Sequence, residues 1–287
     1  MKQLLIISGK GGTGKTVIAG ALAALPKRQV IVDCDVDAAN LHILMQPQIK
    51  ERNDFRCGAT AIIDAGRCTQ CGLCRELCRF DAVSPDFTID PVACEGCGLC
   101  QMACPSDAIE MKENISGQWF ISDTRFGPFV HARLGIAEEN SGKLVTLVKG
   151  KGQKIAEEQK ADWMIIDGSP GIGCPVIASL SGVDCALIVT EPTLSGLHDA
   201  QRVFKVARHF GIATTLAVNK YDLSPEMTQK IEKFCQDNDI EVVAKIAFDR
   251  HVVDAMVNGK TILEDDDCIV KKEIINMWDK LQKRMLE

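Results

Sequence analysis

Short apolar runs alternate with longer segments of helical periodicity along most of the chain. Five of the runs are rich in Ile, Leu, Val and Ala and end next to a polar or glycine residue, which is typical of buried strands. These predicted strands cover residues 4–8, 30–33, 163–167, 186–190 and 213–218. Helical patterns occupy residues 16–25, 195–210 and 225–237. The alternation predicts an α/β fold, with a mostly parallel sheet covered by helices on both faces.

The alternation breaks between about residue 55 and residue 112, where cysteine, glycine and proline punctuate the chain. This interval contains an internal repeat: IIDAGRCTQCGLCRELCRFDAV matches TIDPVACEGCGLCQMACPSDAI at a constant offset of 26 residues. Each half is too small to fold on a hydrophobic core of its own, so we expect bound metal to stabilise the segment. We therefore predict an inserted domain at residues 56–112, within a discontinuous domain formed by residues 1–55 and 113–287.

The cysteine spacing within the repeat, CxxCxxCxxxC followed by CxxCxxCxxxCP, is typical of two 4Fe-4S clusters of the bacterial ferredoxin type. In that pattern the fourth cysteine of each run ligates the other cluster. The predicted ligands are Cys68, Cys71, Cys74 and Cys104 for the first cluster, and Cys94, Cys97, Cys100 and Cys78 for the second. Two zinc sites are the alternative, but the third closely spaced cysteine and the duplication favour iron and sulfide. The insert is thus expected to be ferredoxin-like.

The two runs differ after their last cysteine. Cys104 is followed by Pro105, as the ferredoxin pattern expects, whereas Cys78 is followed by Arg79. A positive charge at this place would favour the reduced, more negative form of the second cluster and raise its reduction potential. A surface arginine without such a role is the alternative.

The glycine-rich stretch GKGGTGKT, residues 9–16, lies between the first predicted strand and the first predicted helix. Its glycines allow backbone N–H groups to turn inward around phosphate oxygens. Lys15 can reach the β and γ phosphates of a nucleotide, and the Thr16 hydroxyl can ligate Mg²⁺. The predicted nucleotide-binding residues of the loop are Gly11, Gly12, Thr13, Gly14, Lys15 and Thr16. This arrangement predicts a P-loop NTPase.

Lys10 stands where the deviant phosphate loop of the MinD/ParA/Mrp superfamily carries its signature lysine, and the chain resembles that superfamily over most of its length. VDCDVDAANLH resembles switch I, with Asp35 as the water-orienting aspartate and Asp37 as the alternative if the register slips. IIDGSPGIG resembles switch II, with Asp167 as the carboxylate that holds the Mg²⁺ shell. Members of the superfamily with an inserted ferredoxin domain resemble the whole chain.

The resemblance implies Mg-dependent ATP hydrolysis, in which Lys10, Lys15, Asp35 and Asp167 act on the transferring phosphoryl group. It also implies a homodimer with ATP at the interface, because the signature lysine reaches the phosphate of the facing subunit. The base is less clear, since NKYD, residues 219–222, also fits the guanine-reading motif of GTPases. The superfamily uses an Asn at this place for adenine, so we expect ATP, with Asn219 as the base reader.

Cys174 lies seven residues after Asp167, at a spacing that resembles the switch II cysteine of the nitrogenase iron protein. In that relative the cysteine binds the cluster that bridges two subunits, so Cys174 is a candidate bridging ligand. Pro175 leaves no CPxC motif of the Mrp kind. A cysteine that packs at the start of a helix is the alternative.

Composition and charge limit the expected cellular location of the protein and the classes of partner it could bind. The formal net charge is -6 and the pI is near 5.5, which argues against a surface devoted to nucleic acid. Neither a signal peptide nor an apolar stretch long enough to span a bilayer is recognisable, so we expect a cytoplasmic protein with reduced cysteines. Near the C-terminus, one helical face is apolar and flanked by basic residues. This helix is expected to dock on the body, with membrane binding as the less favoured alternative.

Three functions fit these features. The preferred hypothesis is an ATPase that couples nucleotide-driven dimer changes to the assembly or delivery of iron–sulfur or other metal clusters, as Mrp-type relatives do. The first alternative is an ATP-gated, low-potential electron donor that resembles the nitrogenase iron protein. The second is a positioning switch of the MinD/ParA type, in which the clusters are structural or sensory. The first two hypotheses require a protein acceptor of clusters or electrons.

Overall fold

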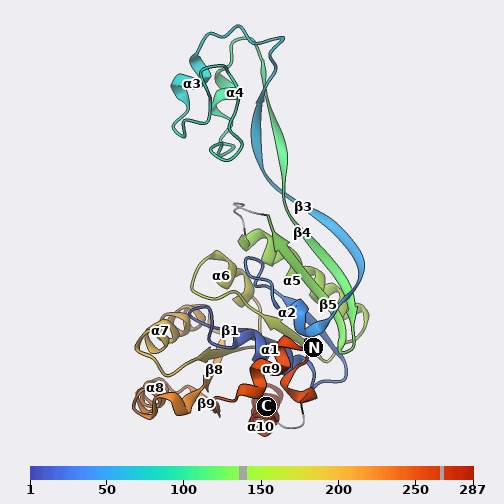
Figure 1. Cartoon of the computed structure of the whole chain (residues 1–287), viewed down its shortest axis with the longest axis vertical. Coiled ribbons are helices and arrows are strands. Elements are labelled where there is room, and N and C mark those ends of the chain that lie inside the picture. The colour runs from blue at the N-terminus through green and yellow to red at the C-terminus, as the bar shows by residue number, and fades with distance from the viewer. Residues whose placement is uncertain (136–140, 266–267) are drawn as a thin grey trace. The chain divides into compact units, whose positions relative to one another are not determined.

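The chain folds into two compact units in the computed structural model, which describes residues 1–135, 141–265 and 268–287 (Figure 1). The first unit consists of Met1–Arg52, Trp119–Arg133 and Ser141–Glu287. The second contains Asn53–Gln118 and the short stretch that begins at Leu134. Two strands, β3 (Gln48–Ile63) and β4 (Ile109–Thr124), carry the chain between the units.

A sheet with seven parallel strands forms the centre of the first unit. Among the described residues the strand order is β3-β4-β5-β2-β6-β1-β7-β8-β9. The parallel strands are β1 (Lys2–Ile7), β2 (Gln29–Asp33), β5 (Gly127–Leu134), β6 (Trp163–Asp167), β7 (Cys185–Thr190), β8 (Ala213–Asn219) and β9 (Glu241–Ile246). Strands β2, β6 and β7 are buried along their whole length, which explains why they appear in the sequence as continuous apolar runs.

Helices cover both faces of this sheet (Figure 1). One face carries α1 (Lys15–Ala23), α2 (Leu41–Met45), α9 (Arg250–Val257) and α10 (Lys271–Leu286). The other carries α5 (Ser141–Glu158), α6 (Cys174–Leu180), α7 (Leu194–His209) and α8 (Pro225–Asp237). Gly152 lets α5 approach β2 closely, because a Cβ at this position would lie 2.4 Å from Val32 Cγ2. The predicted α/β class, with a mostly parallel sheet and helices on both faces, is confirmed.

The C-terminal helix α10 docks on the body of the first unit. Its apolar face, Ile274, Trp278, Leu281 and Met285, is buried in the hydrophobic core. The rings of Trp278 and Trp163 meet edge to face with centroids 4.8 Å apart, which adds to the burial. The apolar face of this basic helix is therefore covered by the protein itself. None of the helices in the described part of the chain is long and apolar enough to cross a bilayer.

The second unit repeats its backbone as it repeats its sequence. Two short helices, α3 (Leu73–Leu77) and α4 (Leu99–Ala103), lie 26 residues apart in the chain and pack against each other. The N–H of Asp64 donates to the carbonyl of Ala108, and the N–H of Asp90 donates to the carbonyl of Ala82, both at 2.8 Å. Each half therefore supplies a bond that closes the other half.

A buried histidine makes the first unit sensitive to acid. The ring of His131 is stacked between Phe120 and Phe129, with centroids 4.9 Å and 4.5 Å away, and its Nε2 lies 3.1 Å from Ser122 Oγ. Burial disfavours the imidazolium form and lowers the pKa of His131 to about 4, from an ordinary value of 6.5. Between these two values the unfolded chain binds more protons than the folded chain, so stability falls as the pH falls.

We expect His131 to cost the protein roughly 2 kcal/mol of unfolding free energy when the pH falls from 6.5 to 5. The measurement is urea unfolding of the wild type and of His131→Gln between pH 7 and pH 5. Glutamine keeps a partner for Ser122 but carries no titrating group. The wild type should lose stability more steeply than the variant, and parallel curves would show that His131 takes up its proton without penalty.

Candidate functional site

The phosphate loop lies between the end of β1 and the start of α1. Gly12 and Gly14 adopt left-handed backbone conformations, with φ of 81° and 86°, which other residues enter only at a cost. A Cβ on Gly14 would also lie 2.3 Å from Asn219 Nδ2. Glycine at this position therefore allows both the turn of the loop and the close approach of Asn219.

Lys15 lies between two buried carboxylates at the carboxyl ends of neighbouring strands, Asp167 at the end of β6 and Asp35 just after β2. Its Nζ is 2.6 Å from Asp167 Oδ1 and 3.1 Å from Asp35 Oδ2. Burial opposes the charge of Lys15, but attraction to Asp167 and then to Asp35 outweighs it and raises the pKa of the ammonium group. A lysine that is charged and buried at the head of a helix is suited to neutralising phosphate oxygens.

Asp33 is a third carboxylate in this cluster. It ends β2 directly opposite Asp167 in β6, and its Oδ1 accepts a hydrogen bond from the Asp35 N–H at 3.0 Å. Burial, followed by the nearby charge of Asp167, raises the pKa of Asp33 well above its usual range. Burial is also the largest cause of the raised pKa of Asp167.

Several buried oxygens in the cluster accept no hydrogen bond from any described residue. They are Asp33 Oδ2, Asp35 Oδ1 and Asp167 Oδ2. Unpaired carboxylate oxygens are costly to bury, and hard oxygen donors are the ligands that Mg²⁺ prefers. The hydroxyl of Thr16 is 3.4 Å from Lys15 Nζ and belongs to the same cluster. The donor set therefore fits a magnesium ion held with the help of Thr16 and Asp167.

The two alternatives for the switch I aspartate differ in position. Asp35 is buried and lines the cleft that contains the phosphate loop. Asp37 is exposed and is not among the residues that line the cleft. The geometry therefore favours Asp35 as the carboxylate that reaches a nucleotide.

Asn219 ends β8 and touches the phosphate loop directly. Its Nδ2 donates to the Thr13 carbonyl at 2.8 Å, and its Oδ1 accepts from the Lys220 N–H at 3.1 Å. Asp222, the last residue of NKYD, accepts a hydrogen bond from the Phe248 N–H at 2.7 Å. Asp222 therefore has a structural partner in this chain, while Asn219 lines the cleft.

Lys10, the signature lysine of the sequence, turns toward α7. Its Nζ is 2.7 Å from Glu191 Oε1 and donates to Ser195 Oγ at 3.0 Å. Glu191 also lies 3.7 Å from Lys220 Nζ. The charge of Lys10 is thus held within its own chain by a partly exposed ion pair.

A cleft of about 550 Å³ opens above the phosphate loop, a size typical of nucleotide-binding sites. One wall is polar and is formed by the phosphate loop with Asp35, Asn40 and Asn219. Another part of the lining is apolar and contains Val252, Met256, Ile262 and Ile274. This division fits a ligand with a charged phosphate end and an apolar ring. The cleft lies at the carboxyl ends of the parallel strands, where α/β sheets usually bind ligands.

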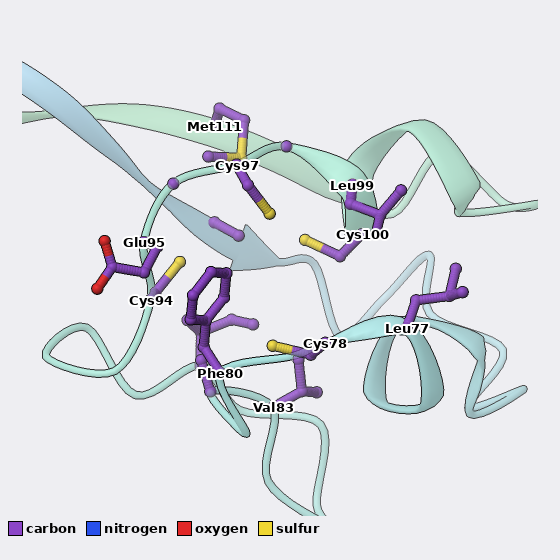
Figure 2. A pocket seen from close by; sticks show the side chains of 15 residues that line it. Leu77, Cys78, Phe80, Val83, Cys94, Glu95, Cys97, Leu99, Cys100 and Met111 are labelled. Atoms are coloured by element: carbon purple, nitrogen blue, oxygen red, sulfur yellow. The ribbon is translucent and has the colours of Figure 1, made fainter.

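The eight cysteines of the repeat gather around two cavities in the second unit. The first is lined by Cys78, Cys94, Cys97 and Cys100, whose sulfurs point toward a common space (Figure 2). The second is lined by Cys68, Cys71, Cys74 and Cys104. Each cavity thus takes three cysteines from one run and one from the other. Among the described residues, no group of three or more His, Cys, Asp or Glu side chains is arranged to hold a single metal ion.

Backbone N–H groups point at two of these sulfurs. The Gln70 N–H donates to Cys68 Sγ at 3.4 Å, and the Ala108 N–H donates to Cys104 Sγ at 3.3 Å. Such bonds stabilise thiolates, which are the form of cysteine that binds iron. Four soft sulfur donors around a space, supported by backbone donors, fit the ligation of a multi-atom cluster.

Cys174 is exposed at the first position of α6. A Cβ on Gly142 would lie 3.1 Å from Cys174 Cβ, so the start of α5 packs closely beside it. Cys174 belongs to no set of three or more described potential ligands that could hold a metal ion. Its position agrees with a cysteine that packs at a helix start.

The sequence analysis assigned no role to two residues of the site, although Asp33 lies within its switch I segment. Asp33 ends a buried strand just as Asp167 does, and that signal could have identified it. Glu191 is 181 positions away from Lys10 in the chain, and only the fold brings the two together. Asp33 affects the charge balance around Lys15, and Glu191 pairs with Lys10.

The comparisons with known proteins agree with this geometry. Residues 4–262 match the CobQ/CobB/MinD/ParA nucleotide binding domain. An uncharacterized protein of Methanocaldococcus jannaschii is 34% identical over 285 residues, covering 98% of this chain and 96% of the relative. The septum site-determining protein MinD of Bacillus subtilis is 26% identical over 274 residues, covering 92% of this chain and 82% of the relative.

A solved structure with a bound nucleotide has the same fold. MinD of Pyrococcus horikoshii, complexed with Mg-ADP, has a TM-score of 0.60 and 19% identity, and the match covers 99% of this chain and 96% of that one. The family match spans the phosphate loop, the carboxylate cluster and Asn219 alike. The chain belongs to the family of the CobQ/CobB/MinD/ParA nucleotide-binding domain.

Proposed function

We propose that this chain is a Mg-dependent ATPase that acts as a nucleotide-driven switch of the MinD/ParA type. The observation that carries the proposal is the position of Lys15, buried between Asp35 and Asp167 in a cleft with one polar and one apolar wall. The complex of Pyrococcus horikoshii MinD with Mg-ADP supports the choice of an adenine nucleotide and of magnesium.

Each residue of the cluster has a separate task in this proposal. Lys15 and the backbone N–H groups of the loop neutralise the charge of the β and γ phosphates. Thr16 and Asp167 would hold Mg²⁺, which would supply positive charge to neutralise the phosphates. Asp35 orients the attacking water in line with the bond that breaks. Asn219 positions the base and braces the loop through the Thr13 carbonyl.

We further propose that the second unit holds two 4Fe-4S clusters, one in each cysteine-lined cavity. The support is the grouping of the eight cysteines, with one ligand of each set exchanged between the two runs. Clusters of this type supply one-electron transfer when bound. Permanent ligation by four cysteines each suits electron transfer better than release of the cluster to an acceptor protein.

The comparisons change the order of the hypotheses. The preferred interpretation of the sequence was cluster assembly or delivery, and the named relatives favour the MinD/ParA-type switch instead. The two cysteine-lined cavities add a second element to this switch. Clusters bound there would pass electrons to a protein acceptor, and ATP binding and hydrolysis would gate the transfer. We adopt that combination as the finer proposal, with a homodimer that binds ATP at its interface.

Nucleotide and metal dependence test the proposed function. Phosphate release is measured for the full chain with ATP or GTP, in Mg²⁺ or in EDTA. We expect turnover of ATP that requires Mg²⁺, and much slower turnover of GTP. Asp222→Ala would destroy base selectivity if the site read guanine, and we expect it to leave ATP turnover nearly unchanged. Absence of ATP binding and hydrolysis would overturn the proposal.

Glu191→Gln is expected to favour the proposed dimer. Lys10 must leave Glu191 before it can reach the phosphate of a facing subunit, and a partly exposed pair contributes less than about 1 kcal/mol. The protein concentration at half-maximal ATP turnover should therefore fall by about two- to fivefold. Turnover is measured over a series of protein concentrations for the wild type and the variant.

Two controls separate this effect from a general change of charge. Glu241→Gln removes an exposed partner of Arg284 and should leave the concentration dependence unchanged. Adding Lys10→Ala to Glu191→Gln should abolish the gain, because the released side chain is then missing. A gain that persists without Lys10 would show that Glu191 acts in another way.

A further inference from the structure

The two cavities of the second unit can be compared position by position. Asp81 and Asp107, 26 residues apart, both adopt a left-handed backbone, with φ of 51° and 48°, just after the last cysteine of each run. With α3 and α4 also in equivalent places, the two halves present the same backbone to their cysteines. Besides the backbone bonds to Cys68 and Cys104, the cavities therefore differ mainly in their side chains.

The largest difference lies two residues after the last cysteine of each run. In the second run this residue is Ser106, whose Oγ is 3.6 Å from Cys104 Sγ, within hydrogen-bond range for sulfur. In the first run the equivalent residue is Phe80, whose ring lines the cavity beside Cys78 and Cys94 (Figure 2). Within the described part of the chain, Cys78 Sγ accepts no hydrogen bond comparable to that from Ser106.

Most of the remaining lining of the Phe80 cavity is apolar. It includes the side chains of Ala61, Leu77, Val83, Ile89, Leu99 and Met111, together with the charged residue Glu95. Two charges stand on the chain next to its ligands, Arg79 after Cys78 and Glu95 after Cys94, and both side chains are exposed. Their signs are opposite and water screens both, so they offset each other. The positive charge of Arg79 alone therefore does not decide the potential of this site.

We propose that the Ser106/Phe80 difference makes the two sites unequal electron acceptors, with the site of Cys68, Cys71, Cys74 and Cys104 the easier to reduce. This inference rests on the proposed binding of 4Fe-4S clusters. Reduction adds one electron and one negative charge to a cluster, and no proton moves and no bond breaks in this step. A hydroxyl that donates to Cys104 stabilises the added charge, whereas the Phe80 ring at the equivalent position offers no such donor. Apolar side chains, including Phe87, line the Ser106 cavity as well, so the hydroxyl is the distinguishing group.

An EPR-monitored redox titration with dithionite as the reductant tests this inference on the full chain, purified without oxygen. The wild type should be reduced in two one-electron steps. Ser106→Ala should lower the higher potential and leave the lower one in place, and Phe80→Ser should raise the lower one. A lost hydrogen bond to a charged sulfur corresponds to about a tenfold change in the reduction equilibrium, or ~59 mV for one electron.

Thr69→Val is the matched control, because Thr69 lines the same cavity as Ser106 but donates to no cysteine sulfur among the described contacts. It should shift neither potential. Equal potentials in the wild type, or equal shifts in Ser106→Ala and Thr69→Val, would overturn the inference while leaving the clusters in place. Iron and sulfide are measured in every sample, and their absence from the wild type would overturn the proposed cluster binding itself.

Discussion

Lys15→Ala is expected to reduce ATP turnover by roughly 10³-fold, because the variant loses the cation that neutralises the transferring phosphate. Lys15 is the basic group that the fold places between Asp35 and Asp167, with Nζ 3.1 Å and 2.6 Å from their carboxylates. The measurement is phosphate release at saturating ATP and Mg²⁺, with nucleotide binding followed separately by calorimetry.

A loss of turnover must be separated from a loss of fold. Lys15→Ala leaves buried carboxylates without their partner, and breaking a buried pair typically costs about 3–5 kcal/mol. Lys15→Arg keeps the positive charge, so we expect it to remain folded by circular dichroism and still to lose most of its turnover, since a planar guanidinium replaces a point charge. Lys220→Ala, at the edge of the cleft, should stay within about threefold of the wild type. Substantial turnover in Lys15→Ala would contradict the proposed site.

Pairs of cysteine substitutions are expected to reveal which ligands share a cluster. The wild type should contain about eight iron atoms per chain, and Cys104→Ala should retain about four. Cys68 lies in the same cavity as Cys104, so Cys68→Ala combined with Cys104→Ala should also retain about four. Cys94 lies in the other cavity, so Cys94→Ala combined with Cys104→Ala should lose nearly all iron. Iron and sulfide are assayed after purification without oxygen.

The same pairs give the opposite result if each run of cysteines binds its own cluster. Cys94 and Cys104 would then share a ligand set, and their double variant would keep about half of the iron. Cys174→Ala serves as a control outside the second unit, because this cysteine is exposed and lies in α6. Unchanged iron in Cys174→Ala would exclude it as a bridging ligand, and a loss would contradict our expectation.

The central strands were predictable from sequence because both of their faces are buried. A continuous apolar run such as Trp163–Ile166 indicates burial on both faces of a strand. Strand β6 forms where the sequence predicts it. Strands β3 and β4 are different. Of the residues of β3, Phe55 and Ala61 are buried, and in QIKERNDFRCGATAII apolar positions alternate with polar or glycine positions only over residues 54–61. These strands owe their existence to pairing with distant partners, which a local pattern does not encode.

The candidate site likewise contains features that follow from local sequence and features that depend on contacts between distant residues. The phosphate loop and the carboxylates after β2 and β6 follow local rules, because a glycine turn before a helix and an acid after a buried strand are visible in the sequence. The contact of Lys10 with Glu191 and the contact of Asn219 with Thr13 join residues far apart in the chain. The difference between Ser106 and Phe80 was visible in the repeat, but its meaning required the cavity that each residue lines.

The pairing of the two long strands, β3 and β4, also determines how the cysteine-rich segment is connected to the rest of the chain. Asp54 Oδ1 and Gln118 Nε2 are 3.3 Å apart, and Ser116 Oγ donates to the Cys57 carbonyl at 2.6 Å. Strands β3 and β4 therefore run antiparallel. The chain enters the segment between them and returns from it at adjoining residues. In this arrangement residues 64–108 connect the ends of two paired antiparallel strands. A two-residue turn such as Asn-Gly could join the same strands. A single insertion or deletion at a hairpin tip would therefore add or remove the cysteine-rich segment without changing the parallel sheet.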